Sequence, residues 1–284
     1  MPSRRLKIEH RTGYRYESTV NASFNEVRMT PLTTRRQYVL SQNLHITPGA
    51  SVQQFTDYWG TTVHSFDVHD PHMMLEVISQ CTVDTEPEHI SAPGIDWHEL
   101  RDSSVVDRFC EFLEPTQLVD LIQEDDERWN LVSEIRNQDS PSIAIDVAFN
   151  TVRERIKYTS GVTNVFTTAT AAWKLQQGVC QDYAHALLAL LRSAGIPAKY
   201  VSGYLHDPSH EIGTTHIAES HAWVEVWNGQ WEALDPTNSR IVADSHVIVA
   251  HGRDYNDVAP LKGIYAGGKS EALGVAVHIT ELAR

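Results

Sequence analysis

Hydrophobic and polar residues alternate in short runs over the first 95 residues, a pattern typical of β-strands with one buried face. The runs cover residues 6–10, 14–16, 44–47, 63–68 and 75–83, with turn residues at Pro31, Pro48, Gly60 and Pro71 between them. We therefore expect a β-rich N-terminal domain with a sandwich-like core over residues 1–95. No candidate catalytic group is evident in it.

Helical spacing begins near residue 96. One apolar run follows Ser103-Ser104, and a second, over residues 142–158, follows Ser140-Pro141. We expect a helical connector over residues 96–145 and a further domain over 146–284, in which helices precede strands. The strands are expected at residues 198–205, 220–227, 230–235, 245–250 and 274–279. This order lacks βαβ alternation, so it predicts an α+β fold with an antiparallel sheet.

Composition and charge narrow the classes of partner. The 284 residues are 41% hydrophobic and 21% charged, as in ordinary globular proteins. The 37 acidic and 23 basic residues give a net charge of −14, which argues against nucleic acid. We see no signal-peptide or membrane-spanning segment, and the three cysteines are too far apart for a metal clip or a disulfide framework. We therefore expect a cytoplasmic protein that does not bind membranes.

Cys180 stands where a helix is predicted to begin. It follows Gly178-Val179, and an apolar helical pattern runs from it until Gly195 and Pro197. Unpaired N–H groups and the dipole at a helix start favour an anion, so a cysteine there can supply a thiolate nucleophile. The alternative is a small buried apolar residue, which is how we interpret Cys81 and Cys110.

A base and an orienting acid are available on two later strands. A two-residue turn at Asn228-Gly229 would place Asp235 opposite Ala222, on the face away from His221. A three-residue loop over 227–229, with Gly229 left-handed, would place Asp235 directly opposite His221, with Cβ atoms about 4.5–5.5 Å apart. We predict this second, even register. Taken singly, the two residues could equally be a strand histidine and an Asp-Pro turn.

Three blocks of sequence resemble the transglutaminase-like branch of the papain-type cysteine enzymes. They are residues 178–184 with 194–198, residues 221–226 and residues 231–237. The resemblance implies a papain/transglutaminase-like α+β core and a Cys-His-Asp triad of Cys180, His221 and Asp235. Weaker blocks at residues 252–255 and 257–260, together with the alternating N-terminal half, resemble bacterial two-domain members with a β-rich N-terminal region.

An acyl-transfer site also needs donors for an oxyanion. The backbone N–H of Cys180 is the first candidate. Papain-type enzymes place a side-chain amide shortly before the cysteine, so Gln177, or its neighbour Gln176, is a candidate for the second, unless both are solvated loop residues. Trp223 shares the predicted His221 face and could form a wall of the cleft or pack in the core.

Other site types are less favoured. His206, His210 and His216 do not show a defined ligand spacing with His221, and no calcium loop is recognisable, so we expect no metal and no cofactor. The sequence thus predicts a cysteine-dependent peptidase or amidase that acts on a protein or peptide substrate. Hydrolysis is preferred because water is always available, whereas transamidation needs an amine site. A transglutaminase and a non-catalytic binding module on the same fold are the alternatives, and the oligomeric state is not indicated.

Overall fold

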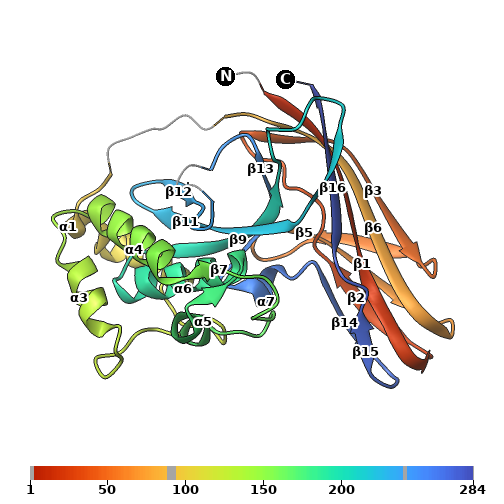
Figure 1. The fold of residues 1–284 in the computed structure, drawn as a ribbon, viewed down its shortest axis with the longest axis horizontal. Coiled ribbons are helices and arrows are strands. Elements are labelled where there is room, and N and C mark those ends of the chain that lie inside the picture. Colours follow the sequence, from red (N-terminus) through yellow and green to blue (C-terminus); the bar gives the residue numbers. More distant parts are fainter. Residues whose placement is uncertain (1–2, 88–93, 239–241, 284) are drawn as a thin grey trace.

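The N-terminal strands follow from the alternating pattern of the sequence. The computed structural model describes residues 3–87, 94–238 and 242–283 (Figure 1). Buried and exposed side chains alternate along the longest strands, as the pattern of apolar residues requires. The six strands in this part are β1 Arg4–Val20, β2 Ser23–Val27, β3 Gln37–Thr47, β4 Val52–Thr56, β5 Thr62–Val68 and β6 His72–Thr85.

Most of the helices follow the six N-terminal strands in the chain and precede β9 (Ala198–Leu205), and α7 comes later, after β13 (His246–Gly252). They are α1 Trp97–Leu100, α2 Ser103–Arg108, the 3₁₀ turn η1 Cys110–Phe112, α3 Trp129–Arg136, α4 Pro141–Arg155, α5 Ala169–Leu175, α6 Cys180–Ser193 and α7 Tyr255–Val258. Ser140 caps α4, and Pro141 occupies its first turn, as the sequence predicts. Every residue of α6 after Cys180 is buried, so this helix forms the centre of the second core.

Some of the remaining strands form a separate four-stranded sheet, and others join the sheets of the N-terminal strands. They are β7 Lys157–Tyr158, β8 Gln177–Gly178, β9 Ala198–Leu205, β10 Thr215–Ala218, β11 Ser220–Trp227, β12 Trp231–Leu234, β13 His246–Gly252, β14 Leu261–Tyr265, β15 Ser270–Ala272 and β16 Ala276–Ala283. The antiparallel sheet β12-β11-β9-β13 packs against α6, whereas β7 and β8 form a short parallel pair. This confirms the predicted α+β class.

Two sheets make up the β-rich part. One has the order β10-β16-β1-β6-β3, with β15 also paired to β1, and the other has the order β14-β2-β5-β4. Their shared core includes Tyr16, Val27 and Phe66. Leu6 and Ile8 of β1 instead join the core around α6, so β1 contributes to both cores. The predicted sandwich therefore packs directly on the helical half (Figure 1).

The division of the chain differs from the predicted one in two places. The boundary at residues 145/146 falls inside α4, because one continuous apolar face spans it. The last strands, which we assigned to the second domain, pair with N-terminal strands: β16 lies beside β1, and β14 lies beside β2. Strand pairing between chain ends depends on backbone hydrogen bonds, so local periodicity does not reveal it.

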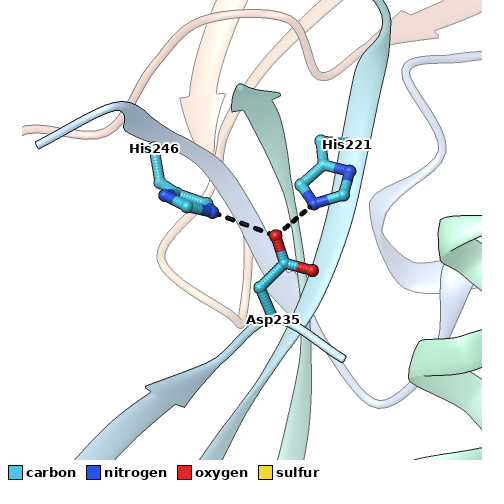
Figure 2. Close-up of side chains that lie close together, drawn as sticks. All are labelled: His221, Asp235 and His246. Atoms are coloured by element: carbon cyan, nitrogen blue, oxygen red, sulfur yellow. Dashed lines mark hydrogen bonds and ion pairs between the residues drawn. The ribbon is translucent and has the colours of Figure 1, made fainter. Parts of the chain in front are cut away.

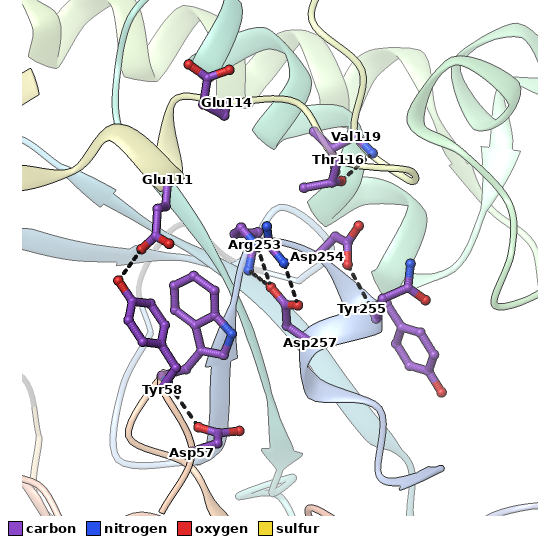
Figure 3. A network of polar contacts seen from close by, with 12 residues as sticks. Asp57, Tyr58, Glu111, Glu114, Thr116, Val119, Arg253, Asp254, Tyr255 and Asp257 are labelled. Atoms are coloured by element: carbon purple, nitrogen blue, oxygen red, sulfur yellow. Dashed lines mark hydrogen bonds and ion pairs between the residues drawn. The ribbon is translucent and has the colours of Figure 1, made fainter. Parts of the chain in front are cut away.

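Polar contacts join the β-rich part to the helical half and hold α6 to the chain after β13 (Figure 3). Tyr58 Oη donates to Glu111 Oε2 at 2.8 Å, which joins the hairpin loop after β4 to η1. Arg253 makes a two-point contact with Asp257, at 2.9 and 3.0 Å. The buried Arg192 of α6 donates to the backbone carbonyl of Arg253 at 2.6 Å. The block around Arg253, singled out in the sequence, therefore anchors the C-terminal end of α6.

Candidate active site

Local capping places the thiol at the first position of α6. Asp182 Oδ2 accepts hydrogen bonds from the N–H of Val179 at 2.8 Å and from Thr163 Oγ1 at 2.6 Å. A Cβ on Gly178 would lie 2.5 Å from the same oxygen, so glycine leaves the room that the carboxylate needs. The Gly178–Asp182 motif thus fixes the helix start, with Cys180 partly exposed beside it.

Cys180 and His221 line one cavity of about 330 Å³. The cavity lies where the N-terminus of α6 meets the start of β11. Its other lining residues are Tyr158, Leu205, Glu219, Ser220, Thr237 and Asn238. The structure therefore brings the predicted nucleophile and the predicted base to the same opening.

His221 and Asp235 form a buried hydrogen-bonded pair (Figure 2). His221 Nε2 lies 2.8 Å from Asp235 Oδ2. His221 is only 8% exposed and Asp235 is fully buried. Because Nε2 faces the carboxylate, Nδ1 is the ring nitrogen left for the thiol side of the imidazole.

The strand register is even, but its pairing differs from our prediction. Trp227 pairs with Trp231, so the connecting loop covers residues 228–230 rather than 227–229. Gly229 is left-handed, with φ of 84°, at the centre of that loop. Asp235 therefore follows the end of β12 and approaches His221 diagonally instead of standing directly opposite. The even register still turns both side chains to the same face.

Asp235 also organises the chain that follows it. Its Oδ1 accepts the backbone N–H groups of Thr237 at 2.9 Å and Asn238 at 3.2 Å, which is an Asx turn. Its Oδ2 accepts from the Asn238 side chain and from His246 Nε2, each at 3.2 Å. The turn and catalytic interpretations of Asp235 are therefore compatible, because each uses a different oxygen.

The pair has strongly displaced pKa values. Burial opposes a charged imidazole, but the hydrogen bond and charge of Asp235, with a contribution from the Cys180 thiol, outweigh it and raise the pKa of His221 to about 9. Burial alone would raise the pKa of Asp235, but hydrogen bonds from His221 and His246 hold it well below its ordinary range. At neutral pH, His221 is therefore an imidazolium beside a carboxylate.

The group His221, Asp235 and His246 also has the composition of a metal site. One donor atom from each lies within 4.8 Å of the others. However, the N–H of Ala243 donates to His246 Nδ1 at 3.3 Å, so Nε2 carries the proton and donates to Asp235. This polarity suits a hydrogen-bonded network better than a metal ligand, which would need a bare Nε2.

Two predicted site residues lie away from the cavity. Gln177 belongs to β8, where its backbone pairs with Lys157, and it does not line the cavity. Trp223 is fully buried with Val201 and Val242, and its ring stacks against His221 at 6.0 Å between centroids. It supports the imidazole from within the core rather than forming a cleft wall, because the β11 face that carries it is covered by the chain around β13.

Sequence reasoning missed three residues of the site. Tyr158, Asn238 and His246 lie near or within it, yet none belongs to a motif that the sequence singled out. Asn238 follows the resemblance block 231–237 immediately, which is a usable signal. His246 lies in a predicted strand. The chain has 15 histidines, and nothing in the residues around His246 distinguishes it from the others.

Comparisons with known proteins agree with this fold. A model described as the bacterial transglutaminase-like N-terminal region matches residues 6–84, and one described as the transglutaminase-like superfamily matches residues 130–236. An uncharacterized protein of Mycobacterium leprae is 42% identical over 282 residues, which cover 98% of this chain and 99% of that protein. The chain belongs to the transglutaminase-like superfamily. Members of this superfamily commonly perform cysteine-dependent acyl transfer.

Other relatives of this transglutaminase-like chain differ in coverage. An uncharacterized protein of Mycobacterium tuberculosis is 31% identical over 97% of this chain and 92% of its own length. The crystal structure of a candidate cysteine protease from Cytophaga hutchinsonii superposes with a TM-score of 0.78 at 24% identity, over 100% of this chain and 92% of that one, which shows the shared fold. A protein-glutamine gamma-glutamyltransferase of Pseudomonas aeruginosa is 40% identical over 67 residues, 22% of this chain and 10% of that protein. In the part of the transglutaminase-like chain that the structure describes, no helix is long and apolar enough to cross a membrane.

Proposed function

We propose that the protein is a cysteine-dependent acyl-transfer enzyme that hydrolyses peptide or side-chain amide bonds. The observation that carries this proposal is the shared cavity of Cys180 and His221, with His221 hydrogen-bonded to the fully buried Asp235. A nucleophile, a base and an orienting acid are thereby within one small volume, the arrangement that covalent catalysis needs.

Each group has one role in the proposed reaction. The Cys180 thiolate attacks the amide carbonyl and forms a tetrahedral intermediate. His221, held as an imidazolium by Asp235, donates its proton to the leaving amine as the C–N bond breaks, which leaves a thioester. His221 then removes a proton from water, the hydroxide attacks the thioester, and the acid leaves as the thiolate is restored.

Tyr158 is our candidate for the second oxyanion donor, beside the N–H of Cys180. It lines the same cavity, and its backbone pairs with Gly178 across the β7–β8 ladder. Burial and the nearby Cys180 raise the pKa of Tyr158, so its hydroxyl keeps its proton and can donate. We expect Tyr158→Phe to lower kcat by about 10²-fold, the size of effect that removing an oxyanion donor has, without slowing alkylation of Cys180.

A second cavity supports a peptide rather than a small amide as substrate. Its volume is about 740 Å³, and it lies where the loop before α5 meets β2 and β14. Phe166 and Ile264 line it with exposed side chains, and Asp67 adds a negative charge. Gln181, next to the thiol, donates to the carbonyl of Val165 in the same loop. Phe166→Ala should therefore lower kcat/KM for peptides and leave a small activated ester unaffected.

The decisive experiment traps the acyl-enzyme. Wild-type protein is incubated with a peptide library, and intact-mass and fragment spectra locate the acyl group. We expect it on Cys180 in the wild type and in the Cys110→Ala control, but not in Cys180→Ala. Cys110 is exposed rather than buried as we expected from the sequence, so it serves as a reference thiol. Absence of any adduct, together with iodoacetamide labelling of Cys180 no faster than that of Cys110, would favour a non-catalytic binding module.

Transamidation is the second candidate reaction. The observation in its favour is the 67-residue similarity to the Pseudomonas aeruginosa glutamyltransferase. Release of the thioester by an amine instead of water would need an amine-binding site. An amide substrate offered with excess primary amine separates the two: we expect free acid, and dominance of the amine adduct would replace hydrolysis by transamidation.

We also place the enzyme in the cytoplasm. The three cysteines are free thiols, and a reducing compartment protects a thiolate nucleophile from oxidation. Fractionation of cells that express the protein would test this location, which recovery outside the cytoplasm would contradict.

A further inference from the structure

We propose that His246 is a positioning residue of this active site: its imidazole N–H holds the Asp235 carboxylate in the place from which that carboxylate orients His221. The inference rests on the function proposed above for the cavity of Cys180 and His221. It adds a fourth member to the site, from a strand that the three sequence blocks do not include.

His246 contacts two residues of the site directly, Asp235 and Trp223. Its Nε2 lies 3.2 Å from Asp235 Oδ2, the same oxygen that bonds His221 (Figure 2). The ring is 9% exposed and packs edge-on against Trp223, with 5.3 Å between centroids. Trp223 in turn stacks on His221, so both imidazoles rest on the same indole.

The direction of the hydrogen bond is fixed from the other side of the ring. The N–H of Ala243 points at His246 Nδ1 at 3.3 Å, so that nitrogen is an acceptor and Nε2 is the protonated one. His246 is thus a neutral donor. It can stabilise the charge of Asp235 without competing with His221 as the cation, and it removes the freedom of the carboxylate to rotate away.

The hydrogen bond from His246 to Asp235 should lower the pKa of His221. A carboxylate that accepts a second N–H shares its charge between two rings, so it stabilises the His221 imidazolium less than it would alone. Removing the donor should raise the pKa of His221 while loosening the carboxylate. Other titratable or charged groups border the two rings from the neighbouring elements: Cys180, Tyr158 and Glu219 line the cavity of His221, and Arg35, Arg36, Glu86, Glu225 and His251 line a cavity beside His246.

The test compares two variants of His246. In His246→Leu the donor is lost, and we expect kcat for a peptide substrate to fall roughly 10-fold, as when an outer partner of an oriented histidine is removed. The alkaline limb of the kcat/KM profile should move up by about half a pH unit. In His246→Gln the amide N–H can occupy the position of Nε2, so both values should return toward those of the wild type.

Several outcomes would overturn the proposal. An unchanged profile and kcat in folded His246→Leu would do so, and so would equal losses in the Leu and Gln variants accompanied by equal falls in Tm, since that pattern marks a structural role. If His246→Leu does not fold, His246→Asn replaces it, because its shorter side chain cannot reach Asp235.

A readout without turnover separates this proposal from the function on which it rests. Imidazole ¹⁵N spectra report the tautomer of His246 and the titration of His221 in an inactive Cys180→Ala background. If the wild type forms no acyl-enzyme, the proposed function fails. The positioning role then still stands or falls on whether His246→Leu raises the titration point of His221 in these spectra.

Discussion

Two groups of histidines in this protein each include a histidine bonded to a buried carboxylate, but the pKa values of those two histidines shift in opposite directions. The active-site cluster contains His221 and His246 around the buried Asp235. The outer cluster contains His206, His210 and His216, beside the buried Glu281. His206 Nε2 lies 3.0 Å from Glu281 Oε2, a contact almost as short as the 2.8 Å contact at the active site.

The pKa values nevertheless shift in opposite directions. The pKa of His221 is raised to about 9. Burial lowers the pKa of His206 despite its bond to Glu281, and it lowers the pKa of His216, which also has two imidazole neighbours.

Beyond burial, two further groups contribute to the difference: the Cys180 thiol also raises the pKa of His221, and Arg4 lowers the pKa of His206. Arg4 Nη1 donates to both oxygens of Glu281, at 3.0 and 3.1 Å. A guanidinium is always charged, so Arg4 shares the Glu281 carboxylate with His206, and its own positive charge lowers the pKa of His206. The described partners of Asp235, by contrast, are imidazoles and amide N–H groups. His221 is therefore held as a cation by a carboxylate that has no guanidinium among its described partners, together with the Cys180 thiol beside the imidazole.

The largest expected effect on the active-site cluster comes from removing the charge of Asp235. In Asp235→Asn the imidazolium of His221 loses its partner and its orientation, and we expect kcat/KM to fall by roughly 10³–10⁴-fold, by analogy with the loss of the orienting acid in serine proteases. Asp207→Asn, at the exposed acid beside the outer cluster, is the matched control and should retain activity. A fall of less than tenfold in Asp235→Asn would remove the acid from the mechanism.

The same charge pair should make folding stability depend on pH. The folded-state pKa of His221 lies above its ordinary value of 6.5, so its stabilising contribution is complete below pH 6.5 and is lost as pH rises through about 9. Tm should therefore fall more steeply between pH 6.5 and 9 in the wild type than in His221→Gln. Parallel Tm curves for the two proteins would contradict the raised pKa.

Removing the guanidinium should make the outer cluster resemble the active site. In Arg4→Met the positive charge beside His206 is lost and the Glu281 carboxylate becomes available to it, so we expect the pKa of His206 to rise. Imidazole NMR titration measures this, with His221 as the internal control because it should not move. A His206 titration that stays in place would show that burial, not Arg4, sets its pKa.

The smallest expected effect concerns His216. Neither ring nitrogen has a hydrogen-bond partner among the described residues, although the ring is 8% exposed and stacks on His210 at 4.1 Å. Replacing it with Phe keeps the stacking and removes the unpaired polar atoms, so His216→Phe should stabilise the fold by about 1 kcal/mol. Chemical denaturation would measure the gain, and a clear loss of stability would indicate a partner for His216.

The fold was predictable where local pattern and final burial agree. The strand ranges 198–205 and 220–227 match β9 and β11, because both strands lie inside the sheet and their apolar positions are obligatory. β2, β4, β10 and β14 were not predicted. They are short, three of them (β4, β10 and β14) lie at sheet edges, and β10 and β14 form by pairing with strands far away in the chain.

The sequence by itself determined the parts of the site that depend on neighbouring residues. Gly178 and Asp182 set the helix start at Cys180, and the even register around Gly229 turns His221 and Asp235 to one face. Only the tertiary structure decided that His246 meets Asp235. β12 and β13 lie at opposite edges of the four-stranded sheet, so no pairing rule joins them. The chain after β12 brings the carboxylate across the sheet to the start of β13, and a contact made by such a crossing leaves no periodic trace in the sequence.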